Sequence, residues 1–317
     1  MKEKNEEINV GGQAVIEGVM MRSPHAVSVA VRKLSGDIVV KKDRYISWTK
    51  RFKILNLPIF RGAVVLIESI VLGIRALAFS GDIAMEEEKS NGKPGAEETL
   101  EIPKKMSGFR LGLLLIVSFG IGLLLFFYLP LVLTDLLGIK SGFWFNIVDG
   151  GFRLLVFFLY LIFITMLKDI RRIFEYHGAE HKSIFTFENK LELTVSNTRK
   201  FTTFHPRCGT SFLLIVMIVS VLVFLFLGRP ETISDRLIRL LFVPVIGGIS
   251  YEFIRLSGKY ADRKFASFLV APGLWLQRIT TKEPDDSQLE VAFAALKSSI
   301  SPDFSKPTEI IKTNNHD

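Results

Sequence analysis

The chain has 317 residues and only one cysteine, Cys208. A single cysteine cannot form an intramolecular disulfide, which excludes a small secreted domain held together by disulfides. Polar aromatic residues are also scarce, since 27 Phe stand against 6 Tyr and 3 Trp. The chain does not open with a charged segment followed by an apolar one, so we expect no signal peptide. The low hydrophobicity of disordered chains is absent as well, because 49% of the residues are hydrophobic.

The hydrophobic and the charged residues must occupy separate segments. The mean hydropathy is +0.33, yet 23% of the residues are charged, close to the average of about 25% in soluble proteins. Lys and Arg (40) exceed Asp and Glu (32), which gives a net charge of +8. In so apolar a chain we interpret this excess as basic cytoplasmic loops that face anionic lipid headgroups. The basic residues flank apolar runs instead of alternating with exposed aromatics, so we expect no nucleic-acid partner.

Four apolar segments predict transmembrane helices, because about 20 apolar residues cross the roughly 30 Å of hydrocarbon in a bilayer. The segments are 111–133, 143–167, 209–228 and 237–254. The second contains Asp149 and Arg153 as an i,i+4 pair, and the fourth contains Pro244, so we expect it to be kinked. The predicted fold class is an α-helical integral membrane protein with a four-span bundle over residues 108–257.

The distribution of positive charge predicts the orientation of the spans. The connection 168–210 carries eight Lys or Arg residues, whereas the connection 138–151 carries one. The positive-inside rule therefore predicts a multi-pass protein of the cell membrane whose N- and C-termini and central loop are cytoplasmic. The expected partner is the lipid bilayer, with anionic lipid headgroups at the basic loops.

Residues 1–80 are predicted to form a cytoplasmic β hairpin region followed by a helix. Segment 10–46 alternates apolar and polar residues, as half-buried strands do. We interpret its glycines as turn or bulge residues, because no phosphate-loop Gly-Lys-Ser/Thr follows them. Segment 57–79 carries three charges at a spacing of seven, which places them on one helix face. We favour a helix lying in the membrane interface; a span with a buried polar stripe is the alternative.

The remaining segments are predicted to be short or disordered. Residues 81–107 are charged and contain Gly and Pro, which predicts a disordered linker. Residues 258–317 begin with an apolar segment too short to span, which we place in the interface. A Ser287–Glu290 capping box then predicts a short soluble helix, and we expect a disordered tail after Pro302.

Three of the five histidines lie between residues 177 and 205. On a helix, His177 and His181 are one turn apart and can both face one metal ion. Glu180 completes the pattern H-x-x-E-H, which supplies two zinc ligands and a general base in inverzincin metalloproteases. We therefore predict His177 and His181 as ligands of a divalent metal, with Zn²⁺ favoured, and Glu180 as the catalytic base.

His205 and Cys208 precede the third span and form a second candidate ligand pair. Cys208 lies at the expected start of a helix beside Arg207, surroundings in which a cysteine can act as a ligand. Glu252, at the cytoplasmic end of the fourth span, is a further candidate ligand, because a carboxylate there needs a partner. Ordinary polarity at the membrane interface is the competing interpretation of all these residues.

Other polar residues have structural interpretations. Thr210 or Ser211 is expected to cap the helix of the third span. Asp285 and Asp286 are expected to start the C-terminal helix and not to bind a metal. Glu17 has no predicted partner.

Four strings of the sequence together resemble the bacterial YqhQ family of multi-pass membrane proteins. They are GGQAVIEGVMMRSP, EYHGAEHKSI, HPRCGTSF and APGLWLQRITTKEPDDSQLEVA. The resemblance extends from about Gly11 to Ala295. The family is described as a domain of unknown function, and sometimes as a predicted metal-dependent enzyme. That second description implies a metal at positions such as His177, His181, His205 and Cys208, without a reaction or a substrate.

Two hypotheses about function follow from these patterns. The first is a metal-dependent hydrolase, of zinc type, whose site lies at the cytoplasmic membrane surface. The second is a non-catalytic metal-binding, transport or membrane assembly protein that uses the same ligands. An open coordination position favours the enzyme, and a saturated Cys/His set favours the structural role.

Overall fold

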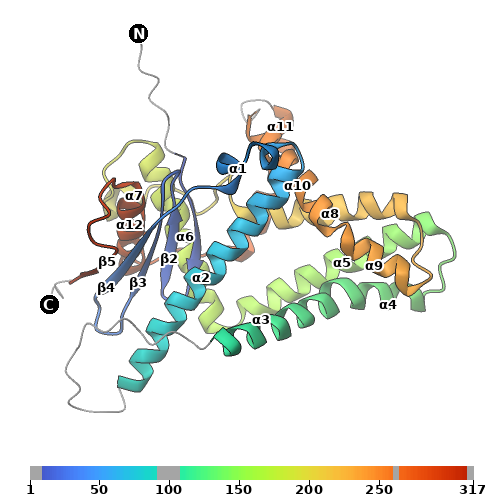
Figure 1. Cartoon of the computed structure of the whole chain (residues 1–317), viewed down its shortest axis with the longest axis horizontal. Coiled ribbons are helices and arrows are strands. Elements are labelled where there is room, and N and C mark those ends of the chain that lie inside the picture. Colours follow the sequence, from blue (N-terminus) through green and yellow to red (C-terminus); the bar gives the residue numbers. More distant parts are fainter. Residues whose placement is uncertain (1–8, 91–107, 260–263, 313–317) are drawn as a thin grey trace, which may run out of the picture.

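The computed structural model describes residues 9–90, 108–259 and 264–312. Figure 1 shows an elongated molecule with a small β-sheet and its covering helices at one end. Long helices extend from there to the opposite end, which carries the connections α4–α5 and α8–α9.

Five antiparallel strands form the sheet, in the order β1-β2-β3-β4-β5. Four of them confirm the predicted β region: β1 (Gly11–Val15), β2 (Gly18–Arg22), β3 (Ala26–Arg32) and β4 (Ile38–Arg44). The fifth strand, β5 (Thr308–Ile311), comes from the other end of the chain and pairs with β4, with Val40 opposite Glu309. It lies in the segment after Pro302, for which we expected disorder.

Helices cover both faces of the sheet. On one face lie α6 (Lys168–Glu188) and α12 (Asp286–Ile300), which pack on Val19, Met21 and Val40 among others. On the other face lies α2 (Phe60–Ser90), which packs through Ala76 and Ile83. Both faces are apolar because successive strand residues point to opposite sides and each side meets a helix. We call the sheet with α2, α6 and α12 the sheet unit.

The other long helices form what we call the helical bundle. Its members are α3 (Gly108–Leu123), the π-helical turn η2 (Leu124–Tyr128), α4 (Leu129–Leu136), α5 (Gly142–Thr165), α8 (Gly209–Leu227), α9 (Ile233–Leu241), α10 (Val243–Lys259) and α11 (Lys264–Thr280). Short helical turns are α1 (Trp48–Arg51), η1 (Lys53–Asn56) and α7 (Val195–Thr198). The predicted kink in the fourth span is the break between α9 and α10.

Within the described residues, five segments, and not the four predicted, are long and apolar enough to cross a membrane: Phe60–Met85, Leu111–Leu136, Gly142–Thr165, Gly209–Leu227 and Ile233–Leu256. The additional segment is α2, whose charges interrupt an otherwise apolar helix. One of them, Glu68, is buried and accepts hydrogen bonds from Tyr45 Oη (2.9 Å) and Ser47 Oγ (2.8 Å). The same helix continues to Ser90, so the predicted linker 81–107 begins inside α2; residues 91–107 lie outside the described ranges.

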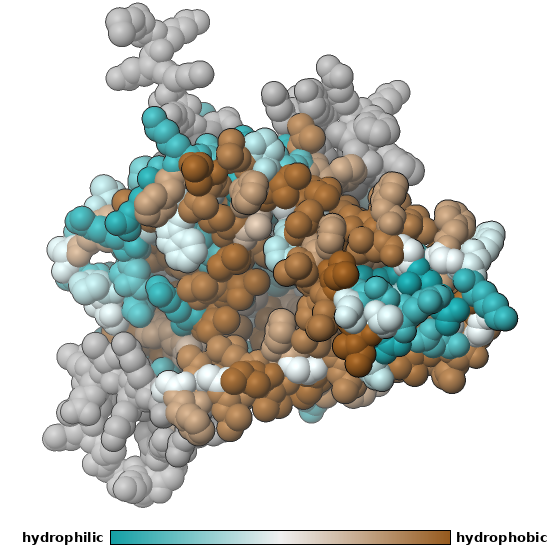
Figure 2. Space-filling model, turned by 45° about the vertical axis from the view of Figure 1, so that its right-hand side comes forward, coloured by the Kyte–Doolittle hydropathy of each residue, from teal (hydrophilic) through white to brown (hydrophobic). Residues whose placement is uncertain are grey.

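The surface of the bundle is hydrophobic over most of the view in Figure 2. The predicted pair inside α5 is confirmed, since Arg153 Nε donates to Asp149 Oδ2 over 2.8 Å and both side chains are buried.

At the other end of the chain, α12 starts where expected but with a different cap. Asp285 is its N-cap and forms the capping box with Gln288, so the predicted box of Ser287 with Glu290 is wrong.

Candidate metal site

Helix α6 carries the H-x-x-E-H pattern along the face that meets the end of α11. His177 and His181 lie one turn apart, with ring centroids separated by 4.4 Å. Gly178 lies between them in the helix, and no larger residue fits there because the chain after α11 passes very close. A Cβ atom there would lie 2.0 Å from the carbonyl oxygen of Lys282. The glycine that weakens the helix in isolation is thus required by packing.

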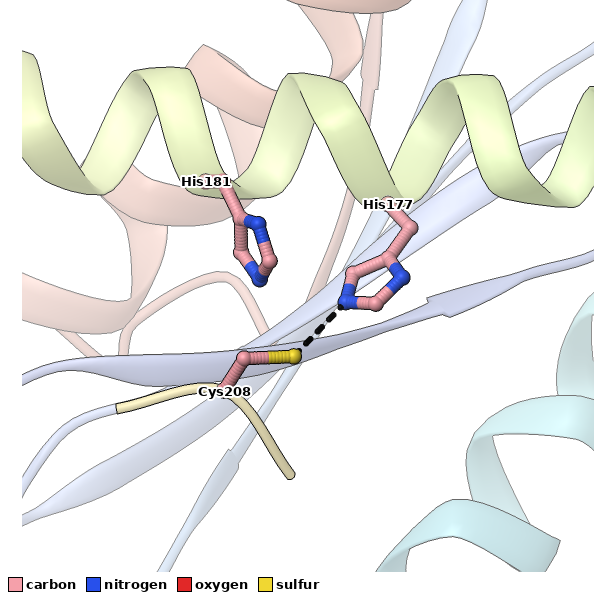
Figure 3. A group of neighbouring side chains, drawn as sticks. All are labelled: His177, His181 and Cys208. Carbon is pink, nitrogen blue, oxygen red and sulfur yellow. Dashed lines mark hydrogen bonds between the residues drawn. The ribbon is translucent and has the colours of Figure 1, made fainter. Parts of the chain in front are cut away.

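Cys208 completes the cluster from the start of α8. It is the N-cap of that helix, and its Sγ accepts the backbone N–H of Thr210. This corrects the expectation that Thr210 or Ser211 would be the cap. The Cys208 Sγ lies 3.2 Å from His177 Nε2, the contact drawn in Figure 3. One ligand atom from each of His177, His181 and Cys208 lies within 4.8 Å of the others.

Two backbone carbonyls determine which nitrogen of each imidazole carries the proton. His177 Nδ1 contacts the carbonyl oxygen of Thr280 (2.9 Å), and His181 Nδ1 contacts that of Thr203 (2.5 Å). A carbonyl oxygen can only accept, so each Nδ1 is the donor and each Nε2 of the neutral ring carries a lone pair that can accept a hydrogen bond or bind a metal. Histidine ligands of metals are held in the same way by outer carbonyls. Thr280 can serve because it ends α11, where helix carbonyls have no partner within the helix.

The two Nε2 atoms point toward the thiol side of the cluster, as Figure 3 shows. His181 is 1% exposed, and its Nε2 is buried without a hydrogen-bond partner in the described ranges. Burial also lowers the pKa of His181, which favours the neutral ring that a metal requires. A buried lone pair without a donor is costly unless something fills the position. A zinc ion with two imidazole ligands and one thiolate fits this donor set.

His205 lies beside the cluster but is oriented differently. Its Nδ1 accepts the backbone N–H of Arg207 (3.2 Å), so its Nε2 carries the proton. That nitrogen lies 3.7 Å from a carboxylate oxygen of Glu188. The backbone of His205 is held by Gln277, whose side chain both accepts from its N–H (2.7 Å) and donates to its carbonyl (2.9 Å). The structure therefore places His205 next to the predicted ligands. In this tautomer its Nδ1 lone pair is used by Arg207 and its Nε2 carries a proton, so neither nitrogen can bind a metal.

Glu180 is buried between α6 and the sheet. Burial raises the pKa of its carboxyl, and nearby His177, His205 and the N–H of Gly12 partly offset that rise. A Cβ on Gly12 would lie 2.9 Å from Glu180 Cδ, so the glycine in β1 makes room for this carboxyl. The Glu180 carboxyl, predicted as the catalytic base, is thus buried from water near the imidazoles of His177 and His205.

Other predicted residues lie elsewhere. Glu252 forms a bidentate ion pair with Arg61 of α2 and is not part of the His/Cys cluster. The carboxylate did need a partner, but the partner is an arginine 191 positions away. Glu17, in the β1–β2 turn, pairs with Arg172 and accepts from Tyr176 Oη (3.3 Å).

Several residues that build the site carry no motif. The carbonyls of Thr203 and Thr280 are backbone groups, which a sequence pattern cannot single out. Gln277 carries a weak signal, because it is a polar residue in an apolar segment and is fully buried. Such a residue needs hydrogen-bond partners.

The comparisons with known proteins agree with the resemblance found in the sequence. The family model described as "Protein of unknown function (DUF1385)" matches residues 57–301. The chain belongs to this family. It is 36% identical over 291 residues to "Uncharacterized protein YqhQ" of Bacillus subtilis (strain 168), which covers 89% of each chain. No solved structure matches it significantly. The family match includes the whole cluster of His177, His181 and Cys208.

The close approach at Gly178 generates a prediction. Gly178→Ala places a methyl group against the Lys282 carbonyl, and overpacking of this kind costs about 1–3 kcal/mol of unfolding free energy. Gly209→Ala is the matched control, because a Cβ on Gly209 meets nothing within 4 Å. Thermal or denaturant unfolding of the detergent-solubilised variants measures both. Equal stability of the two variants would contradict the packing described.

Proposed function

We propose that this chain is a multi-pass membrane protein with a zinc-dependent hydrolytic site on its sheet-unit side. The observation that carries the proposal is the convergence of two tautomer-fixed Nε2 lone pairs and one thiol on a single point. Three protein ligands leave one position open on a tetrahedral ion, which is the arrangement of catalytic zinc sites. A bound zinc ion would supply Lewis acidity toward a water molecule or a substrate oxygen.

The residues of the chain have distinct roles in this proposal. His177, His181 and Cys208 hold the ion, while the Thr203 and Thr280 carbonyls keep both rings in the binding tautomer. Glu180 takes a proton from the attacking water, a role for which a raised carboxyl pKa is suited. His205 packs its ring beside that of His181 and directs its Nε2 to Glu188, so it supports the site from its side.

The sheet supports an even number of membrane crossings. β4 and β5 are hydrogen-bonded neighbours although the whole bundle separates them in sequence. In this proposal β4 and β5 therefore lie on one side of a membrane that the bundle crosses. Helix α11 is short, and its Gly273 packs against Ser211 at the start of α8. It ends beside His177, so we infer that it lies in the membrane interface without crossing.

Helix α2 is the candidate segment that we infer does not cross. Its residues Leu72, Ala76, Phe79 and Ile83 pack on the sheet. Its first turns contact α10, where a Cβ on Gly62 would lie 2.8 Å from the Gly248 carbonyl. This leaves four crossings, by α3–α4, α5, α8 and α9–α10. The excess of Lys and Arg on the sheet-unit side favours the cytoplasm for that side.

A second candidate function uses the same atoms without a metal. A cysteine at a helix N-terminus with an imidazole nitrogen 3.2 Å from its sulfur has the geometry of a cysteine–histidine nucleophile pair. His177 is oriented for that role by the Thr280 carbonyl. Metal content distinguishes the zinc-dependent site from the cysteine–histidine nucleophile pair.

Wild-type protein purified in detergent is expected to contain about one zinc ion per chain, measured by elemental analysis. His181→Ala and Cys208→Ser should lose most of it, because each removes a ligand. Exposed His25→Ala and the non-ligand variant His205→Gln should keep it. Zinc should also slow alkylation of Cys208, the single cysteine of the chain. Metal-free wild type whose alkylation rate falls in a His177→Ala variant would favour the nucleophile pair instead.

Replacement of Glu180 tests its proposed role as the general base. Glu180→Gln keeps the size of the side chain and the bond from Gly12, so zinc content should not change. Hydrolysis of a panel of 4-nitrophenyl esters and phosphoesters should fall by about 10²–10⁴-fold, the usual contribution of a general base. Glu192→Gln, which neutralises an exposed carboxylate in the loop after the same helix, is the control. Equal rates for Glu180→Gln and wild type would refute the assigned role.

The topology predicts which positions react with a membrane-impermeant maleimide. In a Cys208→Ser background, single cysteines at Lys140 and Glu231 should be labelled in intact cells, because both are exposed at the far end of the bundle. Cysteines at Asp43 and Asp303 should react only after permeabilisation. Labelling of Asp43→Cys and Asp303→Cys from opposite sides would contradict the even number of crossings.

A further inference from the structure

A second cluster of charged side chains lies at the end of the bundle farthest from the sheet. It gathers where α4 ends, α5 begins and the chain passes from α8 to α9 (Figure 1). Figure 2 shows hydrophilic surface at this end, bordered by hydrophobic side chains. Four arginines belong to the cluster: Arg153, Arg229, Arg236 and Arg239.

Two aspartates serve these four guanidinium groups. Asp149 pairs with Arg153 (2.8 Å) and lies 3.9 Å from Arg239. Asp135 lies 3.4 Å from Arg229 and 3.3 Å from Arg236. The nearby Asp235 directs its carboxylate to the N-cap of α9, where it accepts the N–H groups of Glu231 and Thr232. Each of the two pairing aspartates therefore faces two arginines.

Because Arg239 is buried, the excess of arginines over their pairing aspartates destabilises this part of the fold. Its side chain is 1% exposed, and its Nη2 donates to Asn146 Oδ1 (2.7 Å) and to the Gly228 carbonyl. Its Nη1 lies 3.9 Å from Asp149 Oδ2, which is too far for a hydrogen bond, and it has no hydrogen-bond partner in the described part of the chain. The buried Nε atoms of Arg229 and Arg236 lack partners there as well. Buried donors of charged groups that remain unpaired destabilise a fold by several kcal/mol in general.

Arg229, Arg236 and Arg239 are connected through shared or neighbouring partners. Arg236 and Arg239 are three residues apart on α9, so they share one face of that helix. Arg229 directly follows Gly228, whose carbonyl accepts from Arg239. The ring of Phe145 lies 5.4 Å from the Arg229 guanidinium, next in sequence to Asn146, the partner of Arg239. Buried arginine N–H groups without hydrogen-bond partners thus lie where the connection between α8 and α9 packs against the start of α5.

We propose that this cluster binds a phosphate group at the end of the bundle opposite the metal site. Phosphate has several acceptor oxygens and matches the planar, forked donors of arginine better than any neutral ligand does. The phosphate of a lipid headgroup and free inorganic phosphate share this chemistry. The site is independent of the zinc proposal, because it uses none of the same residues.

Full-length protein in a neutral detergent tests the proposal with two probes. Phosphatidylglycerol binding is followed by native mass spectrometry, with a diglucosyl diacylglycerol as the phosphate-free control lipid. Inorganic phosphate is titrated against delipidated protein by the shift in Tm, with chloride at equal ionic strength as the control. The variants are Arg229→Gln and Arg236→Gln, which are half-buried and therefore safer for folding than Arg239. Lys140→Gln removes an equal charge from an exposed position at the same end.

Either arginine variant is expected to weaken the binding of at least one probe about tenfold or more, the effect of losing one charge-assisted hydrogen bond. Lys140→Gln should change that affinity less than about twofold. Binding of phosphatidylglycerol alone identifies a lipid headgroup site, and binding of inorganic phosphate identifies a site for the free anion. Absence of binding to both probes would overturn the proposal. Equal weakening by Lys140→Gln would also overturn it, because it would indicate unspecific charge attraction.

Discussion

The packing of α12 on the N-terminal sheet is the interaction on which the rest of the structure depends. Leu289, Ala292 and Leu296 of α12 share one core with strand residues from the other end of the chain. This contact brings the end of α11 to α6, where the Thr280 carbonyl can meet His177. It also returns the chain to the side from which it started. The interface between α12 and the sheet thus determines both the position of the candidate site and the path of the bundle.

The candidate metal site shows how a fold can select a tautomer without any charged partner. Each of its two imidazoles is held by a carbonyl that secondary structure leaves free, one at the end of α11 and one in the loop before Cys208. The third ligand is fixed by its place at the start of α8. The three candidate ligands come from two separate segments, α6 and the start of α8, which only the fold brings together, so binding of an ion by them would be coupled to folding of this region.

The sequence predicted what depends on local spacing and missed what depends on distant contacts. The apolar runs, the Asp149–Arg153 pair and the β strands before residue 46 are all local, and so is the spacing that brings His177 and His181 together. Glu252 was misassigned because its partner, Arg61, is 191 positions away. β5 was missed because four ordinary residues become a strand only beside β4. The length of α2 was underestimated because its charges are satisfied by residues outside the helix, as Glu68 is by Tyr45 and Ser47.

The order in which a ribosome makes the chain gives this arrangement a further consequence. Strands β1–β4 emerge first, but the helix that covers one of their faces emerges nearly last; Ser28 and the Ala295 carbonyl that it contacts are 267 positions apart. Until α12 is made, that apolar face has only α6 as cover, and contacts so distant in sequence form slowly. A nascent or prematurely truncated chain therefore exposes part of an apolar sheet face, and we expect chaperones to bind it or proteases to degrade it rapidly.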